Sequence, residues 1–265
     1  MIKNIKLFVN KNNQSLETAK LIKDKLINNG YIVDDKKYDL AIAVGGDGSF
    51  LRMVKQNNFN SDICYIGINS GHLGFMQEVK VEEIDKFISE LKEEKYKIDE
   101  IGIQETIVNH NRESSKFYSL NEIVIRDKDL KVLKLNINID NDLLENFMGD
   151  GVLISTSSGS TAHNLSYGGS IVYSDLHVLE LTPIAPLNSR SYRTLSNSVI
   201  IPEKREICIM SNDNSKNILL TCDGENYIYN DVEKIEITVK REKIKCLRMY
   251  NYDYTKRIYE KMIKG

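Results

Sequence analysis

The sequence contains no tryptophan, only three prolines and only four cysteines among its 265 residues. A disulfide framework is typical of small secreted domains, and a zinc site needs ligands at short spacing. The scattered cysteines therefore exclude both, and we expect buried free thiols instead. The four histidines form no ligand pair either. The cysteines are Cys64, Cys208, Cys222 and Cys246.

An excess of charge of one sign is also missing, because 36 basic and 38 acidic residues leave a formal net charge of −2. Nucleic-acid binding normally requires a basic surface, so we expect no nucleic-acid partner. Long hydrophobic runs are absent too: the run at residues 40–44 is far too short to span a bilayer, and the first residues lack the apolar core of a signal peptide. These absences favour a cytoplasmic protein without a membrane partner.

The first hundred residues alternate between strand-like and helix-like segments. Strands are predicted at residues 5–9, 40–45 and 64–68, and helices at residues 15–29, 49–55 and 81–96. Such alternation is typical of an α/β domain with a mostly parallel sheet and flanking helices. Ligands of these sheets bind beyond the carboxyl ends of the strands, where Asp47 and Asn69 would lie.

The pattern changes after about residue 100, where short β-rich segments alternate with turn signals. We therefore predict an α/β domain over residues 1–100 and a β-rich, mostly antiparallel domain over residues 101–250. A terminal helix over residues 252–264 is expected to pack back on the first domain. The predicted strands of the second domain are 122–125, 132–139, 152–156, 199–201, 206–210, 218–222 and 235–240.

A glycine-rich loop, Gly45-Gly46-Asp47-Gly48, ends the apolar run at residues 40–44 and leads directly into a predicted helix. Glycine lets the backbone turn tightly and approach a ligand, and the helix start offers free N–H groups to phosphate. The carboxylate of Asp47 would repel phosphate, so it is better suited to accept a proton from a hydroxyl or to hold a cation. The loop indicates a kinase-type site, and a structural capping turn is the alternative.

A second loop of this kind begins with Gly149-Asp150-Gly151 and continues through a strand into the hydroxyl-rich segment 156–162. Serine and threonine hydroxyls beside free N–H groups suit ribose and phosphate oxygens, although a serine-rich capping turn is again the alternative. Two such loops in one chain favour a shared ligand lying between two domains.

Taken together, these motifs resemble those of the NAD kinase family. The family pattern is a GGDG loop, an Asn-Glu pair, a GDG turn and a T-x-[ST]-GSTA loop, and the resemblance covers nearly the whole chain in that order. GGDG alone is shared with lipid kinases and phosphofructokinases, whereas the combination is specific. The matching segments are 45–48, 121–122, 149–151 and 156–162, with further similarity at 69–75, 181–186, 191–195 and 223–224.

The resemblance implies an enzyme that transfers the terminal phosphate of ATP to the 2′-hydroxyl of the adenosine ribose of NAD, giving NADP. It also implies ATP or polyphosphate as the donor, a divalent cation (Mg²⁺) on the phosphates, and a homotetramer or dimer; the residues that hold the cation stay unassigned. By similarity, Asp47 is the base that takes the hydroxyl proton. The residues that the resemblance places at the dinucleotide are Asp47, Gly48, Phe75, Asn121, Glu122, Asp150, Ser158, Thr161, Ala162, His163, Asn164, Ser166 and Ala185.

Two departures from the family pattern bear on substrate affinity rather than on the reaction: Met148 stands where arginine is frequent, and His163 where tyrosine is usual. Asp150 is the rival base, but only Asp47 immediately precedes a helix start suited to phosphate. The alternatives are a lipid or sphingoid-base kinase that shares the GGDG loop, and a non-catalytic NAD(P)-binding module. Donor preference, the choice between NAD and NADH, and feedback regulation stay open.

Overall fold

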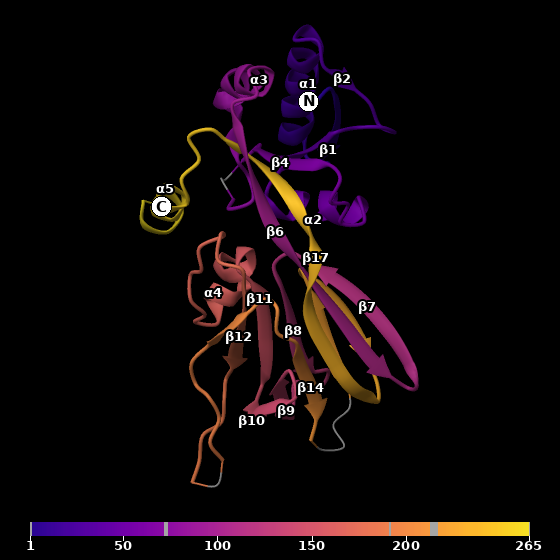
Figure 1. Ribbon diagram of the computed structural model, residues 1–265, viewed down its shortest axis with the longest axis vertical. Coiled ribbons are helices and arrows are strands. Elements are labelled where there is room, and N and C mark those ends of the chain that lie inside the picture. Colours follow the sequence, from indigo (N-terminus) through magenta and orange to yellow (C-terminus); the bar gives the residue numbers. More distant parts are fainter. Residues whose placement is uncertain (1, 72–73, 191, 213–216, 265) are drawn as a thin grey trace. The chain divides into compact units, whose positions relative to one another are not determined.

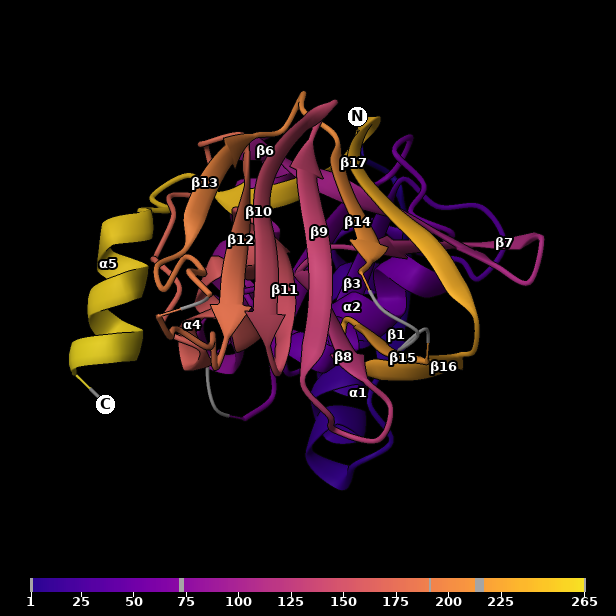
Figure 2. The same ribbon diagram turned by 90° about the horizontal axis from the view of Figure 1, so that it is seen from below.

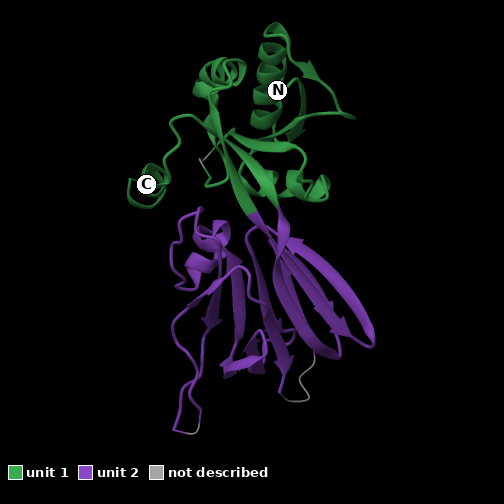
Figure 3. Cartoon of the chain, viewed as in Figure 1, with its two compact units in different colours: residues 1–101, 243–265 green, residues 102–242 purple. Residues whose placement is uncertain are grey.

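The structure is a computed structural model that describes residues 2–71, 74–190, 192–212 and 217–264. His72, Leu73 and Ser191, which belong to the segments similar to NAD kinases, lie outside the described residues. The chain divides into two compact units, unit 1 with residues 1–101 and 243–265 and unit 2 with residues 102–242 (Figure 3).

Unit 1 is built on a parallel sheet with the strand order β2-β1-β3-β4-β17, and β5 also pairs with β4. All six residues of β3 are buried, because this apolar strand lies in the middle of the sheet. The strands are β1 (Asn4–Val9), β2 (Ile32–Val33), β3 (Leu40–Gly45), β4 (Cys64–Asn69), β5 (Val79–Lys80) and the end of β17 (Val232–Met249).

Helices cover both faces of this sheet. α1 (Asn13–Asn28) and α3 (Ile84–Lys92) lie on one face, and α2 (Asp47–Gln56) lies on the other (Figure 1). The apolar stripes of α1 and α3 pack on β3 and β4 in one core cluster, which makes the helices stable in this position. A short turn η1 (Val81–Glu83) precedes α3, and α5 (Tyr254–Ile258) with the π-helical turn η3 (Tyr259–Ile263) ends the chain.

Unit 2 consists of two antiparallel sheets. One has the order β10-β9-β14-β17, with β6 paired to β17 and β7 paired to β6, and the other has the order β13-β12-β11-β8-β15-β16. Figure 2 shows β10, β9 and β14 side by side. The strands are β6 (Tyr96–His110), β7 (Glu113–Ser119), β8 (Glu122–Asp127), β9 (Leu133–Ile139), β10 (Asp142–Gly149), β11 (Gly151–Thr156), β12 (Val178–Ile184), β13 (Val199–Pro202), β14 (Ile207–Ser211), β15 (Ile218–Cys222) and β16 (Glu225–Tyr229).

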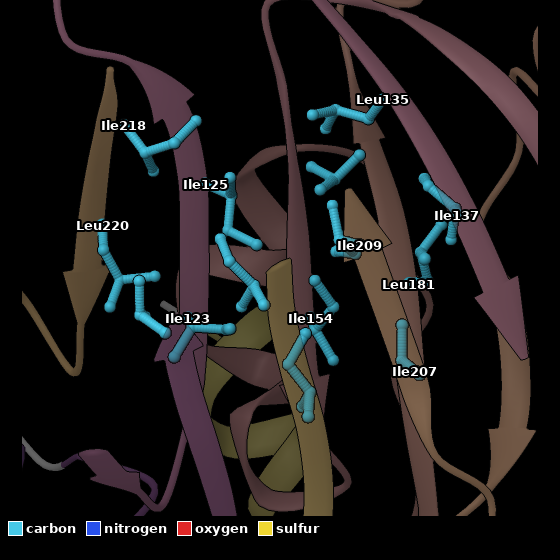
Figure 4. Close-up of a cluster of buried hydrophobic side chains, with 14 of the residues drawn as sticks. Ile123, Ile125, Leu135, Ile137, Ile154, Leu181, Ile207, Ile209, Ile218 and Leu220 are labelled. Atoms are coloured by element: carbon cyan, nitrogen blue, oxygen red, sulfur yellow. The ribbon is translucent and has the colours of Figure 1, made fainter. Parts of the chain in front are cut away.

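The core of unit 2 is a layer of branched aliphatic side chains contributed by both sheets (Figure 4). Ile123 and Ile125 on β8 and Ile207 and Ile209 on β14 point into this layer, and all four are buried. The residue between each pair is buried as well, and Val124 packs with Leu153 and Ile184 in a separate cluster. Successive side chains of a strand point to opposite faces, so β8 buries apolar side chains on both of its faces. Two short helical segments lie between β11 and β12, η2 (Ser158–Thr161) and α4 (His163–Ser166).

The predicted fold class, an α/β domain followed by a β-rich domain, is confirmed, while several boundaries differ. Residues 243–250, expected in the second domain, belong to unit 1, because β17 pairs Cys246 with Tyr65 of β4. The helix predicted at 49–55 begins at Asp47, and the one predicted over 81–96 ends at Lys92.

The four cysteines are free, as predicted, with three of them buried and Cys64 half-buried. None of the described helices has the length and apolar character needed to cross a membrane.

Candidate active site

The GGDG loop forms the turn between β3 and α2 at the carboxyl end of the parallel sheet. Gly46 caps α2, Asp47 is its first residue, and the N–H of Ser49 donates to the carbonyl of Gly46 at 2.8 Å. The sheet positions Asn69 at the end of the neighbouring strand, paired with Gly45. The turn thus presents a carboxylate and a helix N-terminus at the same edge of the sheet.

The side chain of Asp47 is held by the loop that follows β4. Its Oδ2 accepts the N–H of Phe75 at 2.8 Å and its Oδ1 accepts the N–H of Met76 at 3.0 Å. Gly74 makes this approach possible, because a Cβ at that position would overlap the Asp47 carboxylate. Two predicted site residues, Asp47 and Phe75, are therefore in direct contact.

These two hydrogen bonds do not use all the acceptor positions of the Asp47 carboxylate. An ionised carboxylate offers about four acceptor sites, so about two of them stay open to a hydroxyl proton. Gly48 beside it is exposed, which leaves the approach from solvent free of a side chain. Burial lowers the pKa of the Lys261 ammonium on η3, whereas the negative charge of Asp47 acts in the opposite direction.

In unit 2, the Asn121–Glu122 pair begins β8 at a turn fixed by a carboxylate from another hairpin. Asp223 accepts the N–H groups of Leu120, Asn121 and Glu122 at 2.8, 2.9 and 3.2 Å. Asn121 and Glu122 are buried, yet Asn121 Oδ1 and Glu122 Oε2 have no hydrogen-bond partner among the described residues. Buried polar atoms are normally paired, so these two oxygens are suited to a ligand.

The hydroxyl-rich segment packs against the same turn. Thr156 Oγ1 and Ser158 Oγ both donate to the carbonyl of Leu120, the latter at 3.0 Å. Gly159 approaches so closely that a Cβ there would overlap the carbonyl of Asn121. Ser158 is thus beside the Asn121–Glu122 turn, as a common site requires, although its hydroxyl proton is already used in an internal bond.

The 3₁₀ turn η2 and the short helix α4 carry the next predicted residues, Thr161 to Ser166. Thr161 and Ala162 are half-buried, and Ser166 is exposed. His163 donates its backbone N–H to the Glu122 carboxyl, and its ring lies 4.8 Å from that of Tyr167. Burial, followed by the charge of Arg126, lowers the pKa of the His163 imidazole.

Asn164 differs from its neighbours because its side chain is fully buried and engaged. Its Nδ2 donates to Glu180 at 2.8 Å, and its Oδ1 accepts the hydroxyl of Thr182 at 2.6 Å. Glu180 in turn accepts the N–H of Ser170 at 2.7 Å. In this structure Asn164 holds α4 onto β12.

The GDG turn between β10 and β11 lies against the end of β12. The N–H of Asp150 donates to the carbonyl of Ile184 at 3.0 Å, and the Asp150 side chain is exposed. Ala185, the first residue after β12, adopts a φ of +45°, which is uncommon for a residue with a Cβ. Asp150 and Ala185 are therefore brought together, and the strained backbone marks this corner as a site candidate.

Two residues at this site were not assigned a role from the sequence. Asp223 belongs to a segment that resembles the NAD kinase family but was given no role, and the sequence pattern gave no role to Arg126. Arg126 stands opposite Gly151 in the β8–β11 pairing, and its guanidinium lies 5.3 Å from the Tyr167 ring and bonds the Tyr167 hydroxyl. The signal was available: Arg126 lies four residues after Glu122, on the same face of a strand. Arg126 places a positive charge beside the GDG turn. Met148, which precedes this turn, stands where arginine is frequent in the family pattern.

Solved structures with this fold include two kinases. The yeast NADH kinase complexed with NADH has a TM-score of 0.84 and 21% identity, over 98% of this chain and 87% of that one. An NAD kinase from Archaeoglobus fulgidus in complex with ATP has a TM-score of 0.74 and 18% identity, over 97% of both chains. At these identities the likeness shows a common fold.

Sequence relatives are more similar. The NAD kinase of Finegoldia magna is 41% identical over 252 residues, which is 92% of each chain, and NAD kinase 1 of Halalkalibacterium halodurans is 32% identical over 245 residues, which is 91% of this chain and 92% of that one. Residues 5–96 match the family model of the ATP-NAD kinase N-terminal domain, and residues 120–250 match that of the C-terminal domain. The chain therefore belongs to the NAD kinase family.

Proposed function

We propose that this protein is an NAD kinase that transfers the terminal phosphate of ATP to the 2′-hydroxyl of the adenosine ribose of NAD, giving NADP. The observation that carries the proposal is the β3–α2 turn, which presents the Asp47 carboxylate beside a helix N-terminus in a chain of this family. One structure of this fold contains NADH and another contains ATP, which supports a nicotinamide dinucleotide and ATP as the substrates of this protein. No observation favours the lipid-kinase alternative.

In the proposed reaction, Asp47 accepts the proton of the ribose 2′-hydroxyl while the oxygen attacks the terminal phosphorus of ATP and ADP leaves. A ribose hydroxyl is a weak nucleophile, and a positioned carboxylate contributes roughly 10²–10⁴-fold by general base catalysis. The remaining acceleration comes from alignment and charge stabilisation, which dominate phosphoryl transfer. The N–H of Ser49 is already bonded to Gly46, so the N–H groups of the two preceding residues, Asp47 and Gly48, which have no acceptor within the helix, would stabilise phosphate oxygens.

The unit 2 residues are proposed to bind the dinucleotide. Asn121 and Glu122 offer buried oxygen atoms that have no partner within the described part of the chain, and Asp150 offers an exposed carboxylate. The remaining members of the proposed binding set are Ser158, Thr161, Ala162, His163, Asn164, Ser166 and Ala185, with Gly48 and Phe75 beside Asp47 in unit 1.

A divalent cation, with Mg²⁺ as the proposed ion, would neutralise charge on the donor phosphates. Mg²⁺ usually keeps several waters and binds through one or two carboxylates together with substrate phosphates. Within the described part of the chain, no group of three or more Asp, Glu, His or Cys side chains could hold a metal ion. The described side chains therefore fit an ion that is carried mainly by the substrate phosphates, and no residue is assigned to it.

The family resemblance also supports a cytoplasmic location and a homotetramer or dimer. Sedimentation equilibrium of the purified protein tests the oligomeric state, and a monomer would contradict that part of the proposal. ATP and polyphosphate present similar terminal phosphates, so both belong in the activity assay as donors.

The decisive experiment incubates the purified protein with NAD, Mg²⁺ and either ATP or polyphosphate, and follows NADP with an NADP-specific dehydrogenase. We expect NADP to accumulate with at least one donor. If no NADP forms above background with either donor, although the protein binds NAD, a non-catalytic NAD-binding module becomes the better assignment.

A further inference from the structure

The turn between β15 and β16 places the Asp223 carboxylate against the backbone at the start of β8. Asp223 adopts a φ of +46° in this turn and accepts the N–H groups of Leu120, Asn121 and Glu122 at distances between 2.8 and 3.2 Å. The N–H of Asp223 donates back to the carbonyl of Glu122 at 3.1 Å. Three N–H donors stabilise the ionised form of a carboxylate, so Asp223 is the charged member of this cluster.

Glu122 lies in the opposite environment. Its side chain is buried, its carboxyl accepts the backbone N–H of His163, and its Oε2 has no partner among the described residues. The charged group that acts on it is Asp223, and a second negative charge beside Asp223 is unfavourable. Burial, reinforced by the charge of Asp223, raises the pKa of the Glu122 carboxyl to about 8.

We propose that Asp223 is a positioning residue of the dinucleotide site: it fixes the Asn121–Glu122 turn and keeps Glu122 a neutral carboxylic acid. The Oε2 hydroxyl of this acid then donates a hydrogen bond to an acceptor atom of the bound dinucleotide. The inference rests on the proposed function, since it takes NAD as the ligand of this turn. An ionised carboxylate accepts hydrogen bonds from hydroxyl groups, whereas a neutral acid can also face an acceptor oxygen or ring nitrogen.

The first test measures NAD binding by calorimetry between pH 6.5 and pH 9, without a phosphate donor. We expect the wild-type affinity to fall above about pH 8, by up to about tenfold per pH unit, because only the protonated form binds well. His163, whose imidazole pKa lies below its usual value, stays neutral across the upper part of this range. A constant affinity from pH 7 to pH 9 overturns the proposal.

Substitutions separate the neutral acid from an ionised carboxylate. Glu122→Gln keeps a neutral donor of similar shape, so it should bind NAD within about threefold of the wild type at pH 7, and its affinity should not fall at pH 9. A loss of more than about tenfold at pH 7 means that the ligand needs a carboxylate acceptor, which overturns the proposal. Glu113→Gln, at an exposed carboxyl on β7, is the matched control and should keep the wild-type pH profile.

Asp223→Asn tests the role of Asp223 through Glu122. Removing the charge should let Glu122 ionise more easily, so the fall in NAD affinity should begin at a lower pH than in the wild type. A purely structural role would lower the affinity equally at every pH and leave the midpoint unchanged, and that result would refute control through charge.

A measurement on the ligand-free protein keeps this inference separate from the proposed function. Carbon NMR of ¹³C-labelled glutamate carboxyl groups, with Glu122→Gln to assign the signal, should give a titration midpoint near 8 for Glu122. A midpoint near 4.5, the ordinary value, refutes the neutral acid even if the protein makes NADP. A midpoint near 8 in a protein that makes no NADP would leave the inference standing and defeat the kinase assignment alone.

Discussion

The carboxylate of Asp47 holds two backbone N–H groups before any substrate binds, and this determines how the residue can act. The donors, Phe75 and Met76, stand 28 and 29 positions further along the chain and fix the orientation of the side chain. A base that is held in place reaches a hydroxyl in a defined geometry, and orientation is a large part of catalysis.

Asp47→Asn should lower kcat by roughly 10²–10⁴-fold, the contribution of a general base, and leave NAD affinity nearly unchanged. The measurement is kcat from NADP formation together with the NAD dissociation constant from calorimetry. Activity within a few-fold of the wild type would show that Asp47 is not the base. Asp150→Asn is the comparison, because Asp150 is the rival carboxylate.

Gly74→Ala keeps every catalytic group but forces the Asp47 carboxylate away from its N–H donors. A displaced base costs roughly 10²-fold for a shift of about 1 Å, so kcat should fall by about that factor. Gly71→Ala in the same loop is the control, because the nearest atom to its Cβ is Gln14 Oε1 at 4.0 Å. Equal activity of the two variants would mean that the contact between the loop and Asp47 does not matter for turnover.

At the scale of elements, the C-terminal helix is attached to unit 1 by a buried charge cluster. Glu78 accepts from Arg257 at 3.2 Å and lies 3.5 Å from Arg248, whose Nε donates to Asp99 at 3.0 Å. The ring of Tyr252 lies 4.6 Å from the Arg248 guanidinium, within the range of a cation–π interaction. Burial raises the pKa of Glu78, whereas the two arginines act against that rise and support the ionised form.

Arg257→Ala should destabilise the protein by about 3 kcal/mol, because it leaves a buried carboxylate with one cation fewer. The free energy of unfolding is obtained from urea titration followed by circular dichroism. Lys256→Ala, at the exposed neighbour, should change it by less than about 0.5 kcal/mol. If both variants unfold at the same urea concentration, the cluster does not stabilise the helix.

At the scale of the molecule, Glu122 should leave a signature in the dependence of stability on pH. Its pKa is raised from 4.5 to about 8 in the folded state, so the folded protein keeps a proton that the unfolded chain loses first. The contribution of this group is fully present below pH 4.5 and is lost as the pH rises through 8. Stability therefore falls with pH on account of this residue.

Glu122→Gln removes that dependence and should melt at a higher temperature than the wild type at pH 8. The difference in melting temperature between the two proteins should increase from pH 5 to pH 8 and is measured by differential scanning calorimetry. A difference that is constant over this range would show that Glu122 has an ordinary carboxyl pKa.

The sequence was sufficient where local pattern determines structure. The buried strand before Gly45, the presence of a helix after it and the change to short β-strands near residue 100 were predicted correctly, because periodicity and glycine signals are local, although the helix begins two residues earlier than predicted. The helix over residues 81–96 was predicted too long. It ends after Lys92 because Glu94 takes a φ of +55°, a conformation that usually calls for glycine, so no stop signal was visible.

Non-local contacts could not be predicted in the same way. The bonds between Asp223 and the Asn121–Glu122 turn join residues 101 to 103 positions apart, and no spacing rule reports such a pair. The sequence therefore predicts which residues offer oxygen atoms to the proposed ligand, but not how burial and a neighbouring charge raise the pKa of one of these carboxyl groups, Glu122. That property depends on burial and on neighbouring charges, which only the fold determines.

Because unit 2 is inserted between residues 101 and 243, the ribosome finishes it before unit 1 has all of its parts. The nascent chain of residues 1–101 contains Glu78 but neither Arg248 nor Arg257. It also lacks β17, which pairs with β4 in the parallel sheet. Unit 1 can therefore reach its native state only after residues 243–265 have left the ribosome, so the unit that carries the GGDG loop matures after unit 2 has been synthesised.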